Sequence, residues 1–101
     1  MRVLYKEPGK APEVKDIDNT LEALQGLVQG WIEHIELREN RLGLIINEEG
    51  RLHGMDVNFY MPRTGTIVGP AVFVGESGEE FTDILHEDAE VLKIFFSEVA
   101  R

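Results

Sequence analysis

The chain has 101 residues, of which 43% are hydrophobic and 29% charged, and it contains no cysteine. This composition indicates one globular domain over residues 1–101 and excludes disulfides, thiolate catalysis and cysteine metal sites. The formal net charge of -9 argues against direct binding of nucleic acid. Apolar runs too short to span a membrane, together with an N-terminus unlike an export signal, predict a cytoplasmic protein.

The first residues of the chain predict a hairpin. Apolar side chains fall on both sides of a strand over residues 2–6. The Glu-Pro-Gly-Lys sequence at residues 7–10 is typical of a turn, because proline fixes φ and glycine accepts positive φ. A second extended run ends at Ile17, which completes the strand, turn and strand of a hairpin.

The clearest local pattern predicts a helix over about residues 20–29. Asn19 is placed to cap it, with Glu22 three residues later as in a capping box. Gly30 is placed to end the helix in the left-handed conformation. One face of this helix carries the apolar residues Leu21, Leu24, Leu27 and Val28.

A second hairpin is predicted next, with strands over residues 31–38 and 41–47 and a tight turn at Asn40. Residues 51–65 then show neither helical nor strand periodicity. They form either a functional loop or a flap that covers the sheet. The flap would pack three apolar side chains on the sheet, those of Met55, Phe59 and Met61.

The last third of the chain predicts another strand and a second helix. A Gly-Pro step interrupts the apolar strand at residues 67–74, which indicates an edge position or a bulge. A turn at 75–78 and a strand over 81–84 follow. Apolar residues at helical spacing predict a helix over about 86–99, and the acidic residues near its start suit the helix dipole.

Two amphipathic helices among hairpin-like strands predict an α+β fold. We expect a mostly antiparallel sheet built from hairpins, with both helices, at about 20–29 and 86–99, packed on one face. Five side chains should be almost fully buried in the core: Leu24, Leu44, Val72, Leu92 and Phe96.

The largest charge feature is an acidic stretch at residues 76–90, which contains seven Asp and Glu residues and no Lys or Arg. We expect this stretch to be a solvated surface that keeps the protein soluble. A docking face for a basic partner is the alternative. The basic N-terminal region could also meet these acids in a second copy, and exposed sheet edges offer a route to such a homodimer.

The aperiodic segment contains the residues that we expect to carry any specific function: His53, Asp56, Asn58 and Tyr60. A His–Asp pair beside a hydroxyl suits general acid–base chemistry, although the sequence aligns no nucleophile with it. The alternative is that these polar side chains only face water. Other polar residues have ordinary explanations as caps, turns or solvated surface, and His34 is expected to face solvent from its strand.

Motifs for metals and cofactors are missing from the sequence. It has no His-Glu-x-x-His pair, no complete calcium loop and no glycine-rich phosphate loop. We therefore expect no metal ion, no cofactor and no assigned catalytic residue.

Four blocks of sequence resemble a known family: Glu-Pro-Gly-Lys-Ala-Pro-Glu-Val (7–14), Thr-Leu-Glu-Ala-Leu-Gln-Gly-Leu-Val-Gln-Gly-Trp-Ile-Glu (20–33), Asn-Glu-Glu-Gly (47–50) and Ile-Val-Gly-Pro-Ala-Val-Phe-Val-Gly (67–75). The family is the one of uncharacterised bacterial and phage domains catalogued as domain of unknown function 3846. The resemblance implies a setting in phages, prophages and mobile elements, mostly of Gram-positive bacteria. It also implies that an Asn resembling Asn58 recurs in the middle loop, and it supplies no catalytic residues.

These observations favour a non-enzymatic accessory protein that binds a host or phage protein. The alternative is a small-molecule site in residues 51–65, for a nucleotide-type or other ligand, with or without catalysis. A pocket that holds His53, Asp56 and Asn58 together would support this alternative.

Overall fold

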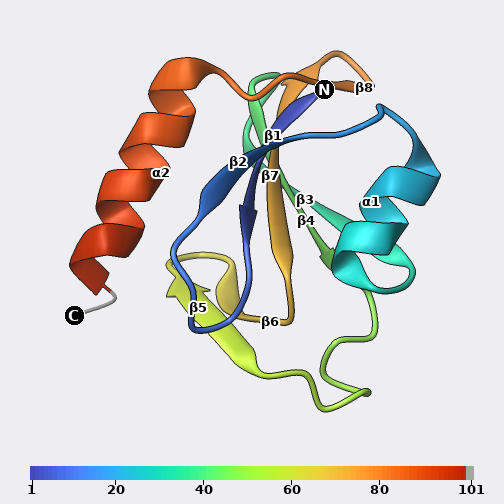
Figure 1. Ribbon diagram of the computed structural model, residues 1–101, viewed down its shortest axis with the longest axis vertical. Helices are drawn as coiled ribbons and strands as arrows, with labels where there is room; N and C mark the ends of the chain where they lie inside the picture. The colour runs from blue at the N-terminus through green and yellow to red at the C-terminus, as the bar shows by residue number, and fades with distance from the viewer. Residues whose placement is uncertain (100–101) are drawn as a thin grey trace.

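The computed structural model describes residues 1–99 and contains two helices and eight strands (Figure 1). The helices are α1 (Leu21–Val28) and α2 (His86–Val99). The strands are β1 (Arg2–Lys6), β2 (Glu13–Asp16), β3 (Ile32–Arg38), β4 (Leu42–Asn47), β5 (Val57–Met61), β6 (Gly65–Val68), β7 (Ala71–Ser77) and β8 (Glu80–Thr82). Both predicted helices and the first two predicted hairpins are thereby confirmed.

The main sheet is antiparallel, with the strand order β2-β1-β7-β4-β3 and with β8 paired to the far end of β7. The central strand is β7, in which Phe73 pairs with Leu4 of β1 on one side and with Leu44 of β4 on the other. The predicted α+β class with a mostly antiparallel sheet is confirmed.

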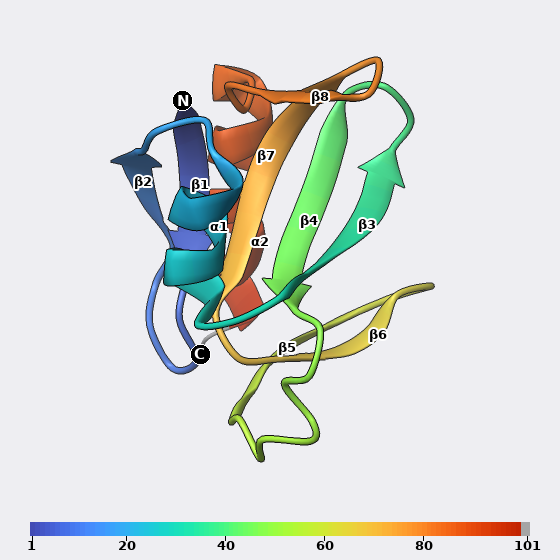
Figure 2. The same cartoon turned by 90° about the vertical axis from the view of Figure 1, so that its right-hand side faces the viewer.

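The prediction that both helices pack on one face is wrong, because they cover opposite faces (Figure 2). Consecutive residues of a strand point to opposite sides. The side chains of Leu44 and Phe73 therefore join a core cluster under α2, whereas those of Ile45 and Val72 join a cluster under α1. The unbroken apolar runs in β4 and β7 reflect this burial on both faces, which requires a helix on each side.

Residues 51–65, predicted to lack regular structure, include β5 and the start of β6, which form a separate two-stranded sheet. Phe59 is buried in the cluster under α2, and Met61 packs against it, as the flap alternative predicted. The Gly-Pro step does not mark an edge or a bulge. It lies at the corner where the chain leaves β6 and enters the central strand β7. Gly69 has a φ of 76° at this corner, and a Cβ there would lie 2.6 Å from Met55 Sδ.

The caps of α1 also differ from the prediction. Thr20 is the N-cap and its Oγ1 accepts from the backbone N–H of Ala23, whereas Asn19 Nδ2 donates to the Phe81 carbonyl. At the other end Gln29, with a φ of 67°, takes the left-handed conformation predicted for Gly30. Leu24 and Val28 remain on the buried face of the helix, whereas Leu21, predicted on the same face, is exposed.

The five predicted core residues are all buried, which confirms the predicted faces of both helices. Neither helix of the described chain is long and apolar enough to cross a membrane.

Candidate ligand-binding cavity

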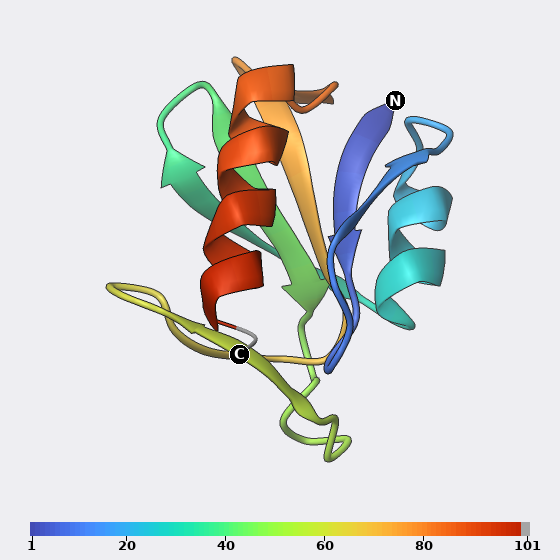
Figure 3. The ribbon, with the colours of Figure 1, turned by 60° about the vertical axis from the view of Figure 1, so that its left-hand side comes forward.

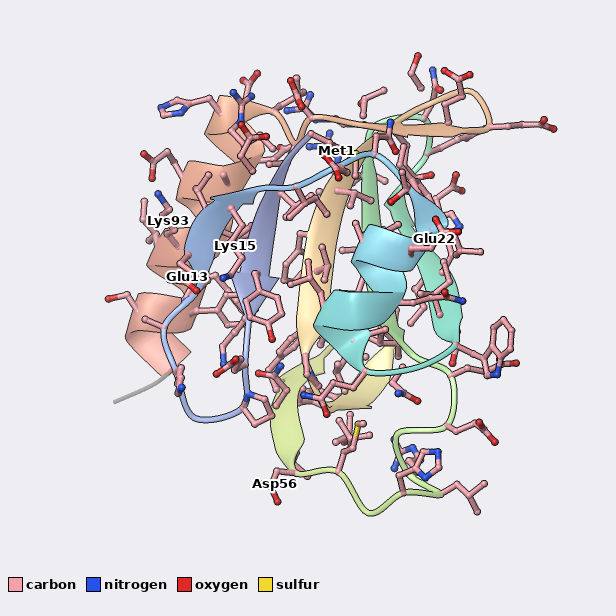
Figure 4. All side chains as sticks on the ribbon, turned by 45° about the vertical axis from the view of Figure 1, so that its right-hand side comes forward. Met1, Glu13, Lys15, Glu22, Asp56 and Lys93 are labelled. Carbon is pink, nitrogen blue, oxygen red and sulfur yellow. The ribbon has the colours of Figure 1, made fainter. Side chains whose placement is uncertain are left out.

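The structure separates the four residues predicted to carry function. His53 is exposed in the turn after β4, where its Nε2 lies 3.8 Å from Glu49 Oε1. Asp56 is exposed just before β5, at the end of the molecule far from α1's first turn (Figure 4). Asn58 and Tyr60 lie on β5 and both line a cavity, whereas His53 and Asp56 lie outside its lining.

The cavity has a volume of about 750 Å³ and lies at one end of the main sheet. Three parts of the chain surround it: the turn between β1 and β2, strand β5 and the C-terminal half of α2 (Figures 1 and 3). The residues that line it are Lys6, Gly9, Lys10, Ala11, Pro12, Asn58, Phe59, Tyr60, Lys93, Phe96 and Ser97. This size falls in the usual range for small-molecule sites, about 300–1,000 Å³.

Lys6 is the most buried charged residue of the lining, with 6% of its surface exposed. Its Nζ donates to Asn58 Oδ1 at 2.8 Å and to the Glu7 carbonyl at 3.4 Å, and it lies 5.3 Å from the centre of the Phe96 ring. Burial lowers the pKa of Lys6, because loss of water disfavours the ammonium form. No carboxylate of residues 1–97, whose side chains the structure describes, forms a salt bridge with this ammonium, and its two hydrogen-bonding partners there are neutral oxygens.

Asn58 fixes the position of Lys6 and closes one end of the fold. Its Nδ2 donates to the carbonyls of Lys6 and Gly69, both at 2.8 Å, while its Oδ1 accepts from Lys6 Nζ. One side chain thus joins the end of β1, strand β5 and the corner before β7. This role differs from the predicted alternative of a polar side chain that only faces water.

Two further lysines lie at the rim. Lys10 Nζ is 2.8 Å from Glu7 Oε2, and this contact lowers the pKa of Glu7 and raises that of Lys10. Lys93 Nζ lies 3.7 Å from Glu90 Oε2 on α2 (Figure 4). Neither carboxylate lines the cavity, and the described lining therefore combines three lysines with no acidic side chain.

The three lysines of the lining, Lys6, Lys10 and Lys93, were not predicted from the sequence as residues of a ligand site. The signal for Lys6 lay in strand alternation. Lys6 is two residues after Leu4 and must share its face of β1, which is the face that packs under α2. The lysines of the turn and of α2 meet only through tertiary packing, which one-dimensional spacing does not reveal.

Outside the cavity, two acids from the predicted solvated stretch are buried instead. Glu76 Oε2 lies 3.1 Å from His34 Nε2, so His34 does not simply face solvent as predicted. A side chain at Gly43 would collide with this Glu76 oxygen, and the glycine thus makes room for the pair. Asp88 receives two hydrogen bonds of 3.0 Å from the guanidinium of Arg41, which ties the first turn of α2 to the start of β4.

The fold and this geometry define a small α+β domain with a cationic cavity beside one end of its sheet. Among the side chains that the structure describes, those of residues 1–97, no group of three or more His, Asp or Glu is arranged to hold a metal ion. The chain belongs to the family described as Domain of unknown function (DUF3846), whose model matches residues 1–97, and the resemblance seen in the sequence is confirmed. No curated protein and no solved structure matches the chain.

Proposed function

We propose that this protein is a binding module that holds an anionic small molecule in the cavity between the β1–β2 turn, β5 and α2. The observation that carries the proposal is the charge of the lining. The chain has a net charge of -9, yet the described lining contains three of its ten Lys and Arg residues and no Asp or Glu. This local reversal of charge favours an anionic ligand.

Lys6 supplies the physical reason for a ligand. Among residues 1–97 no carboxylate forms a salt bridge with Lys6. A buried ammonium without an ionised partner is costly, since desolvation is not offset by an opposite charge. A bound anion would provide that charge where the low local dielectric makes the attraction strong. Asn58 holds Nζ at a fixed position, so the ammonium is already oriented before the ligand arrives.

The proposal can be tested by titrating the protein with inorganic phosphate and following backbone amide shifts by NMR. We expect shifts that saturate and that cluster in the β1–β2 turn, β5 and the second half of α2. Lys6→Met keeps an unbranched side chain of nearly the same length but removes its charge, and should weaken phosphate binding at least tenfold.

Lys15→Met is the matched control for this test. Lys15 lies on β2 outside the cavity lining, with its Nζ 5.2 Å from the centre of the Tyr5 ring (Figure 4). This variant should bind phosphate as the wild type does. Shifts scattered over the whole surface, or equal affinity in Lys6→Met and Lys15→Met, would contradict the proposal.

A second candidate function is binding of a host or phage protein, in line with the accessory role expected from the sequence. The outward surface of α2 favours it, because Val91 and Ile94 are exposed one helical turn apart, with Phe95 beside Ile94. The test is a pull-down that compares the wild type with Val91→Ser/Ile94→Ser. Loss of a captured protein with this variant, but not with Leu52→Ser at another exposed apolar residue, would support protein binding.

A further inference from the structure

The cavity has an aromatic side as well as a cationic one. Phe59 and Phe96 form part of its buried wall, with ring centres 4.9 Å apart in an edge-to-face arrangement. Tyr60 differs from them, because it lines the same cavity with 65% of its surface exposed. Its neighbour on the chain, Phe59, turns into the core, as strand alternation requires.

An exposed tyrosine on the rim of a cavity offers a flat surface for a planar ligand. Aromatic rings stack on tyrosine with little dependence on their identity, since every such ring has a π-face. Pro12 and Ala11 add further apolar surface to the lining. The cavity thus presents two chemistries side by side, an apolar surface for a ring and ammonium groups for an anion.

The number of lysines favours one kind of anion. A carboxylate carries one negative charge, whereas a phosphate monoester carries about 1.5 to 2 at neutral pH and has three acceptor oxygens. Lysine binds phosphate as a compact point charge, and several lysines can share its oxygens. Lys6 in the wall, with Lys10 and Lys93 at the rim, suits a phosphate better than a single carboxylate.

We propose that the ligand joins a phosphate ester to a planar aromatic ring, as in a nucleoside monophosphate. The phosphate lies near Lys6, and the ring lies against Tyr60. This inference rests on the proposed function, because it names the class of anion that the same cavity holds. The volume of about 750 Å³ accommodates a molecule of this size.

Calorimetric titration with five compounds separates the two parts of the ligand. AMP and phenyl phosphate carry both a ring and a phosphate, ribose 5-phosphate and inorganic phosphate lack the ring, and adenosine lacks the phosphate. We expect AMP or phenyl phosphate to bind about tenfold more tightly than ribose 5-phosphate, which corresponds to one stacked ring. Adenosine should bind more weakly than AMP.

The outcomes distinguish this inference from the proposed function. If ribose 5-phosphate and inorganic phosphate bind as tightly as both ring compounds, the ring is not recognised and the inference fails, while anion binding stands. If no phosphate compound binds, both proposals fail.

Variants localise the ring. Tyr60→Ala should weaken AMP binding about tenfold and leave ribose 5-phosphate binding unchanged, with an unaltered melting temperature because Tyr60 is exposed. Trp31→Ala is the matched control, since Trp31 is also 65% exposed but lies outside the cavity lining, and it should change neither affinity. Equal weakening of both ligands by Tyr60→Ala would overturn the placement of the ring.

A second pair of variants localises the phosphate. Lys93→Gln should weaken AMP and ribose 5-phosphate by the same factor, because both ligands carry the group that it contacts. Lys15→Gln removes a lysine of similar side-chain exposure, 38% against 40%, from a site outside the lining. Equal affinities in these two variants would contradict a contact between Lys93 and the phosphate.

Discussion

The two helices cover the sheet in different ways. α1 is short, yet both of its ends are fixed: Thr20 caps the first turn, and Asn47 Nδ2 donates to the carbonyls of Val28 and Gln29 at the last turn. α2 is longer, and Arg41 ties its first turn to the sheet through two hydrogen bonds to Asp88. Its second half packs through apolar side chains and leaves the cavity open beside them.

This difference shows where the fold has room for a ligand. On the α1 face, the side chains of β1, β4 and β7 meet the helix directly and form a closed core. On the α2 face, the β5–β6 hairpin crosses below the end of the helix (Figure 3), and Lys6 occupies a position that an apolar residue would fill in a closed core. One face therefore serves mainly stability, and the other combines stability with a cavity.

The largest expected effect is the loss of stability in Phe96→Ala, which removes an aromatic ring from the core cluster under α2. Phe96 is buried, and its ring centre lies 4.9 Å from that of Phe59 and 5.9 Å from that of Phe73. Removal of a buried phenylalanine costs about 3–5 kcal/mol of unfolding free energy, out of a typical total of about 5–15 kcal/mol. Urea denaturation measures this loss. The adjacent Phe95→Ala, at a half-exposed position, should cost much less, and equal losses would show that α2 is rotated.

A smaller effect is expected from Asn47→Ala on the α1 face. The substitution removes both donations to the helix end and the bond of 2.7 Å that Oδ1 accepts from the Glu49 N–H. Leaving such buried groups unpaired costs about 1–3 kcal/mol. Hydrogen exchange should show that the last turn of α1 loses protection. Glu48→Ala, at the exposed neighbouring position, provides the control, and similar exchange in both variants would argue against the role of Asn47.

Thr20→Ala tests the N-cap and should cost about 1 kcal/mol, the usual effect of losing a capping side chain. Asn19→Ala removes one exposed hydrogen bond, to the Phe81 carbonyl, and should cost less. Thermal melts of the two variants decide between the observed cap and the one predicted from the sequence. A larger loss for Asn19→Ala would favour the predicted capping box.

The smallest change in stability at neutral pH is expected from Tyr5→Phe, because this substitution changes stability mainly in alkaline solution. Burial, with help from the hydrogen bond to Glu7, raises the pKa of Tyr5 from 10.0 to about 12. Above pH 10 the unfolded chain therefore loses a proton that the folded chain keeps, and the stability that Tyr5 contributes is lost between about pH 10 and 12. Tyr5→Phe should abolish this part of the alkaline decline in urea-denaturation free energies.

Lys6, on the opposite face of β1, has the opposite effect on how stability changes with pH. Its pKa is lower in the folded protein than the usual 10.5, so between the folded pKa and 10.5 the unfolded chain binds more protons and stability rises with pH. Lys6→Met should remove this rise and expose a steeper alkaline decline than that of the wild type. An identical pH profile in Lys6→Met and wild type would contradict the burial of Lys6.

Local patterns were sufficient to predict the helices and the first two hairpins. Leu24 and Val28 on one helix face, and Asn40 with a φ of 55° in the turn, obey rules that depend on near neighbours in the chain. Which face of the sheet each helix covers does not follow from such rules. The unbroken apolar runs Leu44–Ile46 and Ala71–Val74 did indicate that both faces of the sheet are covered, because strands of this kind are buried on both sides.

The candidate site was predictable only in part. Asn58 and Tyr60 were singled out because the segment around them lacks a clear period, and the register shift between Val57 and Phe59 accounts for part of that irregularity. The lysines of the cavity come from two distant parts of the chain, the N-terminal hairpin with Lys6 and Lys10 and helix α2 with Lys93. In the sequence Lys93 resembles an ordinary surface lysine. Their meeting depends on the docking of α2 and the hairpin, which only the fold provides.

The central position of β7 has a consequence for how the protein is made. β1 is synthesised before the other strands of the sheet, but its partner in the middle of the sheet is β7, through pairs such as Leu4 with Phe73. β4 also pairs with β7, so the edge of β4 that faces the middle of the sheet stays unpaired until β7 is available. The earlier hairpins can form as the chain leaves the ribosome, yet the two cores cannot close before β7 has emerged. Ribosome-stalled chains that end before Ala71 should therefore stay sensitive to protease, and resistance should arise late and abruptly rather than hairpin by hairpin.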